Sequence, residues 1–377
     1  MTPEKAKVAL VFDWMTTSGG AERVNLVLHK LFANAPIFTS VYNPEKVKGF
    51  ENSTVKTSFI QKLPLAKTHH QYYLNLMPYA FEQIDLSDFD IIISSSHSCA
   101  KGIITKPESL HICYCHSPMR YAWDDWHNYV SNYKMNPILK FFGKKQLHRL
   151  RMWDRLSADR VDHFIANSNT TKKRIAKYYK KFSKVIHPMI NTKDFILNEN
   201  STRDFYLAVG RLTPYKKFGL IVDAFNKNGK QLKIVGDGVE LSTLKAKAKN
   251  NIEFLKFIPD DKLKELYGQA KALIFPQIED FGITPLEAMA CGTPIIAFNK
   301  GGALETVVEN ISGIFFDKQT EKGLNDAIEK FEKIEKSFDR QKIRKHVEKF
   351  DTECFEKQLM DFIGEKWEQL QKQNTNR

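Results

Sequence analysis

The sequence predicts an α/β protein made of two Rossmann-like, doubly wound domains that face a cleft. Three observations lead to this prediction. Short hydrophobic runs alternate with helical stretches along the chain, which is typical of βαβ units. The runs are continuous rather than alternating, as strands are when helices cover both faces of their sheet. The 377 residues also exceed one ordinary core and indicate about two domains.

Ten runs are expected to form buried strands, four in the first half of the chain and six in the second. The first four are Val8–Trp14, Asp90–Ser95, Leu110–Cys115 and His163–Ala166. The other six are Phe205–Val209, Gln231–Val235, Ile252–Phe257, Ala272–Pro276, Pro294–Phe298 and Gly313–Phe316. Helical stretches separate them, so the sheets are expected to be parallel.

The domain boundaries follow from a change in composition. The strand periodicity restarts after residues 187–204, a polar stretch with a proline and several turn formers, where we place the linker. We therefore expect one domain over residues 1–190 and a second over 191–350. Residues 351–377 remain, and their amphipathic part, Thr352–Leu370, is expected to pack on the body of the protein.

The composition favours a globular protein of a reducing compartment, which we expect to be the cytoplasm. The N-terminal residues have no apolar signal core, so no export is expected. No apolar run approaches the roughly 18 residues of a membrane span. The five cysteines form no regular framework, which argues against a disulfide-stabilised secreted fold.

The net charge of +13 is concentrated in one segment. Residues 1–130 carry 12 basic and 12 acidic side chains, whereas residues 131–184 carry 15 Lys and Arg against three acids. This segment, called the basic block below, predicts a local anionic partner. Its apolar residues alternate with cations, which suits an anionic membrane surface. The alternative is that the charged helix faces are solvated and the apolar sides of the same helices pack internally. No nucleic-acid-binding motif is present.

The stretch EDFGITPLEAMACGTP, which starts at Glu279, is unusual because two carboxylates flank an expected helix start. It follows a buried strand, and ligands bind at that edge of open α/β sheets. Thr284 is a good N-cap, so Glu287 at N3 would complete a capping box. A helix start also suits a diphosphate. Glu279 and Glu287 would then accept hydrogen bonds from sugar and ribose hydroxyls, and Gly282 would allow close backbone approach.

Fixed cations follow the strand that opens the second domain. Arg211 and Lys216 lie in RLTPYKK at a strand exit, and both can bind phosphate oxygens. Surface solubility is the alternative explanation, and Lys217 could replace Lys216. The turn IVGDGVE, with Gly238, leaves the next strand at the same edge and is by itself typical of a tight turn.

The first domain has a glycine turn of its own. MTTSGG follows the first strand, and Gly19 and Gly20 precede a helix expected to begin near Ala21, where backbone amides can face an anion or a sugar. A simple strand–helix turn explains them equally well. The pattern is not G-x-G-x-x-G, so no nicotinamide site is predicted.

The stretch CYCHSPMRYAWDDW places His116 at the end of an expected strand. Cys113 and Cys115 would point to one face and His116 to the other, which argues against a metal site. His116 could hydrogen-bond a sugar hydroxyl, or it could be a satisfied structural histidine. Arg120 follows in an aromatic-rich loop suited to acceptor contacts.

These motifs together resemble the retaining glycosyltransferase family 4, of GT-B fold. The resemblance rests on the E-x7-E pair of Glu279 and Glu287, on RLTPYK and on IVGDG, and it is strongest from about residue 166 to residue 317. The strings SGGAE and CHSPMRYAWD are similar to those of bacterial mannosyltransferases that build lipopolysaccharide O-antigen or exopolysaccharide.

The resemblance implies a role for each matching position. Arg211 and Lys216 would bind the donor diphosphate, Glu279 the transferring sugar and Glu287 the ribose. His116 would contact the donor sugar, and Arg120 the acceptor. Backbone groups would line the donor site at these positions: Gly19, Gly20, Gly238, Phe281, Gly282, Ile283 and Thr284. No metal or other cofactor is implied, and the terminal helix is expected to cross back to the first domain.

The implied function is transfer of a hexose, with mannose and GDP-mannose as the best match, to a lipid-linked saccharide acceptor. The enzyme would work in the cytoplasm at the inner face of the membrane, which it would contact through residues 131–184, with no nucleic-acid partner. A UDP-sugar donor, a GT-B-type nucleotide-sugar epimerase and a non-catalytic nucleotide-sugar-binding protein are the alternatives.

Overall fold

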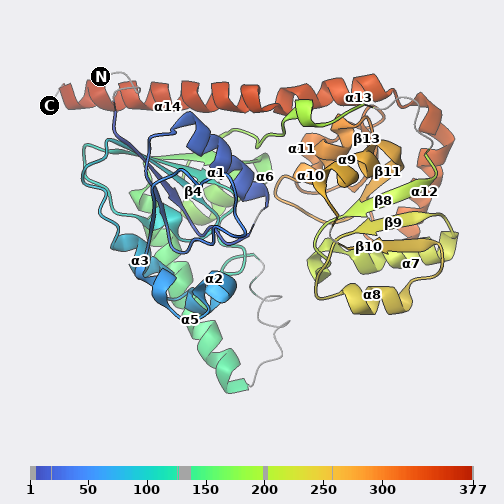
Figure 1. Ribbon diagram of the computed structural model, residues 1–377, viewed down its shortest axis with the longest axis horizontal. Coiled ribbons are helices and arrows are strands. Elements are labelled where there is room, and N and C mark those ends of the chain that lie inside the picture. The colour runs from blue at the N-terminus through green and yellow to red at the C-terminus, as the bar shows by residue number, and fades with distance from the viewer. Residues whose placement is uncertain are drawn as a thin grey trace. The chain divides into compact units, whose positions relative to one another are not determined.

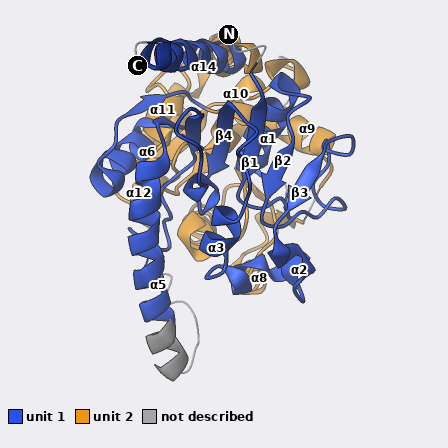
Figure 2. Ribbon diagram, turned by 90° about the vertical axis from the view of Figure 1, so that its left-hand side faces the viewer, with its two compact units in different colours: residues 1–187, 355–377 blue, residues 188–354 orange. Residues whose placement is uncertain are grey.

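The computed structural model describes residues 6–17, 19–124, 126, 137–197, 203–256 and 258–375, with the side chains of 137–142 left out. The chain divides into two compact units (Figure 2). Unit 1 comprises residues 1–187 and 355–377, and unit 2 comprises residues 188–354. The sequence placed the corresponding boundaries at 190 and 350.

Unit 1 contains a parallel sheet with the strand order β3-β2-β1-β4-β5-β6-β7 among the described residues. All residues of β4 and all of β1 except the partly buried Val8 are buried, in line with cover on both sheet faces. The strand bounds are β1 (Val8–Phe12), β2 (Ile37–Thr39), β3 (Val55–Thr57), β4 (Ile91–Ser96), β5 (Leu110–Cys115), β6 (His163–Ala166) and β7 (Ser183–Val185).

The helices of unit 1 pack around this sheet (Figure 1). The longer ones are α1 (Gly20–Leu31), α3 (Met77–Glu82), α5 (Pro137–Ser157) and α6 (Asn169–Arg174). Shorter turns include α2 (Ala66–His69), η3 (His70–Tyr73) and η4 (Ala100–Gly102). One core cluster joins Val11 of β1 and Ile92 of β4 to Phe81 of α3 and Leu150 of α5.

Unit 2 contains a second parallel sheet, with the order β10-β9-β8-β11-β12-β13 in the described part of the chain. The strands are β8 (Phe205–Val209), β9 (Leu232–Val235), β10 (Ile252–Leu255), β11 (Ala270–Phe275), β12 (Ile295–Phe298) and β13 (Gly313–Phe316). All ten strands expected from the sequence are present, within one or two residues at most ends. Phe257, the expected end of one of them, lies outside the described residues.

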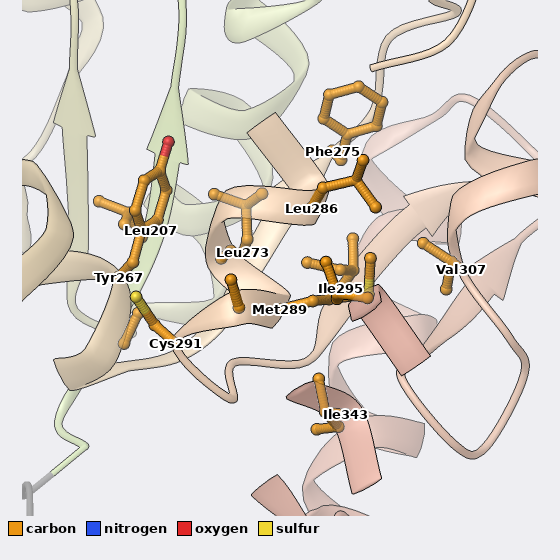
Figure 3. Packing of buried hydrophobic residues seen from close by; sticks show 14 of the residues in the cluster. Leu207, Tyr267, Leu273, Phe275, Leu286, Met289, Cys291, Ile295, Val307 and Ile343 are labelled. Atoms are coloured by element: carbon orange, nitrogen blue, oxygen red, sulfur yellow. The ribbon is translucent and has the colours of Figure 1, made fainter. Parts of the chain in front are cut away.

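Helices cover both faces of the second sheet, which explains why its strands are apolar on both sides. Leu207 belongs to the core under α9, α10 and α13, a part of which is drawn in Figure 3, whereas its neighbour Tyr206 belongs to the core under α7, α8 and α12. The helices are α7 (Phe218–Asn228), α8 (Leu241–Lys247), α9 (Asp260–Gln269), α10 (Ile283–Ala290), α11 (Ala303–Thr306), α12 (Glu321–Ile334) and α13 (Arg340–Val347).

The last helix, α14 (Thr352–Thr375), begins in unit 2 and from Phe355 onward belongs to unit 1. Its buried residues are Phe355, Leu359, Ile363 and Trp367, all within the amphipathic stretch Thr352–Leu370 expected from the sequence. The ring of Phe355 lies 5.8 Å from that of Tyr114 on β5. The apolar stripe of α14 therefore completes the core of unit 1.

Candidate active site

The carboxyl ends of β8 and β11 form the candidate site of unit 2. These two strands lie side by side, with β9 and β10 on one side and β12 and β13 on the other. The strand order thus reverses between them, and in open α/β sheets ligands bind outside the strand ends at such a switch point. β8 leads into RLTPYKK, and β11 leads into the loop that contains Glu279.

Lys216 and Glu279 meet at this point as an ion pair. Lys216 ends the short helix η8 (Pro214–Lys216), and its Nζ contacts Oε1 of Glu279. The two side chains are only 15% and 20% exposed. Lys217 is exposed and adopts left-handed backbone (φ 61°) before α7. The structure therefore brings Lys216, and not Lys217, to Glu279.

Arg211 is exposed where the chain leaves β8, and the loop around it is fixed by backbone contacts. Leu212 N–H donates to Asp237 C=O at 2.9 Å. A Cβ on Gly238 (φ 157°) would lie 2.5 Å from the Leu212 carbonyl oxygen. The G-D-G turn therefore packs tightly against the Arg211 loop. This close packing explains why residue 238 is a glycine, independently of the expected donor contact.

Helix α10 begins two residues earlier than the capping-box expectation requires. Its N-cap is Gly282 (φ 91°), and no side chain caps it. The prediction of a Thr284 cap paired with Glu287 is therefore wrong, because Ile283 and Thr284 already lie within the first turn. The first N–H groups of a helix have no partner within the helix, and no side chain caps those of α10.

Glu287 is 7% exposed, and its Oε2 accepts a hydrogen bond of 2.8 Å from the hydroxyl of Tyr267. Tyr267 is buried near the end of α9. The carboxylate is thus held from the neighbouring helix, in place of the expected contact with its own helix start. Burial of a charge is costly unless hydrogen bonds compensate, so this contact fixes the orientation of Glu287.

Gly301 and Gly302 support the loop of Glu279 to Gly282, and sequence reasoning missed them. Gly302 N–H donates to Glu279 C=O at 2.9 Å. A Cβ on Gly302 would lie 2.2 Å from Phe281 C=O, and one on Gly301 (φ 71°) 2.6 Å from Glu279 C=O. The adjacent glycines of NKGGAL were the signal that could have indicated this close backbone approach.

In unit 1 the glycine turn lies after β1. Gly19 is the N-cap residue of α1, with extended backbone (φ −165°), and Gly20 is the first helical residue. The helix therefore starts one residue before the expected Ala21. A Cβ on Gly19 would lie 3.1 Å from Oε2 of Glu22, so a side chain would crowd the first turn.

His116 follows β5, and its Nε2 lies 2.8 Å from Oγ of Ser95 on β4. Burial, with a smaller contribution from His97, lowers its pKa to about 3. The imidazole is therefore neutral near pH 7 and suited to hydrogen bonding with a neutral hydroxyl.

Arg120 is partly buried in the loop after β5. Burial, with a smaller contribution from the charge of Arg120, lowers the pKa of Arg174. Arg174 forms an ion pair with Asp124 at 2.8 Å. The loop proposed for acceptor contacts is thus tied to α6 through charged groups.

Helix α5 carries much of the basic block, of which residues 131–136 lie outside the described residues. Leu147 and Leu150 are buried, and Trp153 donates from Nε1 to Glu82 at 2.8 Å. The Lys144, Lys145 and Arg149 side chains are exposed. The apolar side of α5 thus packs internally, as the alternative in the sequence analysis required, while cations remain on the surface.

Two negative findings concern the described residues alone. They contain no group of three or more His, Cys, Asp or Glu side chains placed to hold a metal ion. Within the same ranges, no helix is both long and apolar enough to cross a membrane.

Comparison with known proteins identifies the family. Residues 18–194 match the family model described as Glycosyltransferase Family 4, and residues 189–350 match that of Glycosyl transferases group 1. Together the matches run from residue 18 to residue 350. The chain belongs to the family 4-like glycosyltransferases.

Mannosyltransferases are among the relatives of this glycosyltransferase. The O-antigen chain mannosyltransferase RfbU of Salmonella typhimurium is 28% identical over 227 residues, 56% of this chain and 62% of the relative. The alpha-1,3/1,6-mannosyltransferase ALG2 of Dictyostelium discoideum is 30% identical over 221 residues, 45% of this chain and 53% of the relative. The chain thus matches little more than half the length of these relatives.

Solved structures confirm the GT-B fold. HepE of Anabaena in complex with UDP has a TM-score of 0.70 at 17% identity, with 95% of this chain and all of that chain covered. WaaG, a glycosyltransferase involved in lipopolysaccharide biosynthesis, has a TM-score of 0.67 at 14% identity over 94% of this chain and 99% of that chain. At these identities the likeness extends to the fold alone.

Proposed function

We propose that the protein is a retaining hexosyltransferase that moves mannose from GDP-mannose to a lipid-linked saccharide in cell-surface polysaccharide synthesis. The observation that carries the proposal is the Lys216–Glu279 pair at the switch point of unit 2, beside the start of α10. The names of RfbU and ALG2 support mannose as the transferred sugar.

In this proposal, cations and helix amides bind the donor diphosphate. Arg211 and Lys216 contact phosphate oxygens, and the first turn of α10 adds N–H donors. Lys216 then exchanges its contact with Glu279 for one with phosphate, which frees the carboxylate for hydroxyls of the transferring sugar. Glu287, held by Tyr267, accepts a hydrogen bond from the ribose.

The chemical step is the departure of the nucleotide diphosphate. The bond between C1 of the sugar and the phosphate oxygen breaks, and C1 bonds to the acceptor oxygen on the same face, so configuration is retained. The acceptor proton passes to the departing phosphate oxygen. Fixed positive charge at Arg211 and Lys216 stabilises the charge that develops on the leaving group. No metal ion takes part in this scheme.

The test is thermal stabilisation of the purified protein by GDP, UDP, ADP and their sugars in the presence of EDTA. A ligand that binds only the native state raises the melting temperature. A selective response to GDP and GDP-mannose supports the donor assignment. No response to any nucleotide would contradict the site assignment.

A UDP-sugar donor is the second candidate, because the HepE structures contain UDP and UDP-glucose. The same melting experiment separates the two donors. A selective UDP response would keep the site and the mechanism but replace the base and the sugar.

The proposed acceptor places the enzyme at the cytoplasmic face of a membrane, with the exposed cations of α5 on an anionic surface. Lys144, Lys145 and Arg149 suit this test because their side chains are exposed, whereas Arg151 donates to the Ala122 carbonyl. Replacing the three with Gln should weaken binding to vesicles with anionic lipid, at about 1 kcal/mol per charge. Exposed lysines of unit 2 provide the charge-matched control: Lys245, Lys262 and Lys322. Equal binding of both triple variants would contradict the membrane contact.

A further inference from the structure

Unit 1 has a switch point of its own, and polar side chains that the proposed function leaves unused gather there. The strand order reverses between β1 and β4, with β5 next to β4. Asp13, His97 and His116 directly follow β1, β4 and β5. The His97 and His116 rings lie 6.4 Å apart. Three neighbouring strands therefore place one carboxylate and two imidazoles at the same sheet edge.

Asp13 holds this edge together. Its side chain is 1% exposed and accepts backbone hydrogen bonds from His97 at 2.6 Å, Ser98 at 2.8 Å and Ala100 at 2.6 Å. The same carboxylate lies 3.1 Å from Nδ1 of His97. A buried carboxylate with this many donors has a fixed position, so it can fix the ring of His97 as well.

The contact with Asp13 determines which nitrogen of His97 carries the proton. A carboxylate accepts hydrogen bonds, so Nδ1 is the nitrogen that donates to Asp13, and in this tautomer Nε2 is an acceptor. The side chain of His97 is 34% exposed. Within the described ranges, no hydrogen-bond partner approaches Nε2. An oriented acceptor atom is thus presented to solvent at the place where such sheets bind ligands.

The two neighbouring histidines, His116 and His70, make different side-chain contacts. His116 is bonded through Nε2 to Ser95, and Nδ1 of His70 lies 3.2 Å from Oγ1 of Thr16. Burial lowers the pKa of His116 to about 3 and that of His70 to about 4, so both are neutral near pH 7. The Trp14 ring lies 4.6 Å from that of His97 at 86° and limits its rotation.

An alternative is that Asp13 only fixes the loop after β4. That role would explain its contacts with backbone N–H groups, but it does not require the imidazole of His97. The three N–H donors satisfy the carboxylate without the His97 side chain. A purely structural residue at position 97 also gains nothing from an acceptor that points outward.

We propose that Nε2 of His97 accepts a hydrogen bond from a hydroxyl group of a saccharide, and that Asp13 is the positioning residue for this contact. The inference rests on the proposed function. It adds that unit 1 binds the acceptor, and it names the atom that accepts a hydrogen bond from the acceptor's hydroxyl group. The ligand class is a hexose residue with a free hydroxyl group.

The test is NMR of the full chain with labelled histidine. The nitrogen shifts of His97 should report a proton on Nδ1 and none on Nε2. Methyl α-mannoside, methyl α-glucoside and methyl α-galactoside are then titrated, each alone and with GDP. We expect at least one glycoside to shift the His97 signal. A proton on Nε2 in the free protein, or no shift with any of the three, would overturn the inference.

Two substitutions separate binding from structure. His97→Asn keeps a donor near the Nδ1 position for Asp13 but removes the outward acceptor, so glycoside affinity should fall about fivefold or more with the melting temperature unchanged. His97→Gln offers an oxygen near the Nε2 position and should restore part of the affinity. His148→Asn, on the exposed side of α5, is the control and should bind as the unmodified chain does.

An unchanged glycoside affinity in the folded His97→Asn variant would also overturn the inference. Failure of the proposed function is distinguishable, because stabilisation by GDP depends on unit 2 and is measured without any glycoside. A chain that binds glycoside through His97 but ignores every nucleotide would keep this inference and lose its link to sugar transfer.

Discussion

At the scale of single residues, Lys216 and Glu279 are each other's partner, so a donor has to separate them. Glu279→Gln keeps the size of the side chain and removes its charge. Lys216 is then available to phosphate, and we expect GDP to bind as tightly as before or more tightly. Transfer should fall about 100-fold or more, because the sugar loses an ionised acceptor. Calorimetry of GDP binding and turnover measurements check this. Lys216→Gln is the counterpart, and it should weaken the binding of GDP. Equal loss of GDP affinity in both variants would contradict the proposed exchange.

The contact between Tyr267 and Glu287 belongs to the same scale. Tyr267→Phe removes one hydroxyl and leaves a buried carboxylate with one donor fewer. We expect a loss of about 1–2 kcal/mol in the free energy of unfolding and weaker binding of the nucleotide. Urea denaturation measures the first effect. Tyr72→Phe is the control, since Tyr72 is 70% exposed and should tolerate the change.

Single residues also show what the sequence could not determine. The sequence placed Lys216 and Glu279 at one sheet edge, but their ion pair was not predicted. The partner of Glu287 was mispredicted because a capping box is a local pattern, whereas Tyr267 lies 20 residues away on another helix. Asp13 and His97 are 84 residues apart, so no spacing rule joins them.

At the scale of elements, the two glycines before α11 support the loop that leads into α10. Gly302→Ala would place a Cβ 2.2 Å from the Phe281 carbonyl and displace the loop that carries Glu279. We expect a loss of stability of about 1–3 kcal/mol and a smaller thermal response to GDP. Gly268→Ala in α9 is the control, because its Cβ would meet nothing within 4 Å and helical Ala is favoured by about 0.5–1 kcal/mol. A normal GDP response in Gly302→Ala would contradict the supporting role.

The three strands that the sequence did not predict share one property. β2, β3 and β7 are three residues long each, and β3 and β7 lie at the two edges of their sheet. Three residues are too few to display a period. The other ten strands are four to six residues long, and all of them were predicted.

At the scale of the whole molecule, acid should destabilise unit 1 before unit 2. Burial lowers the pKa of His111 and His70 to about 4 and that of His116 to about 3. Between these values and the ordinary pKa of about 6.5, the unfolded chain binds more protons than the folded one. Stability is therefore complete above about pH 6.5 and falls as the pH decreases, by up to about 2 kcal/mol per group at pH 5. Of the eleven histidines, only His346 lies in unit 2.

The tryptophans make this prediction measurable, because all five lie in the residues of unit 1. Urea unfolding followed by tryptophan fluorescence should show a lower midpoint at pH 5 than at pH 7.5. His148→Gln should leave this difference unchanged, since His148 is exposed. Identical midpoints at the two pH values would contradict the effect of the buried imidazoles.

The assignment of α14 to unit 1 has a consequence for the synthesis of the protein on the ribosome. Unit 2 is one continuous stretch of chain, so it can fold as soon as residues 188–354 have left the exit tunnel. Unit 1 is translated first but lacks Phe355, Leu359, Ile363 and Trp367 until the end of that stretch has passed. The side chains of β5 that these residues cover, such as Tyr114, stay exposed on the nascent chain in the meantime. The part of the enzyme that is made first is therefore completed last.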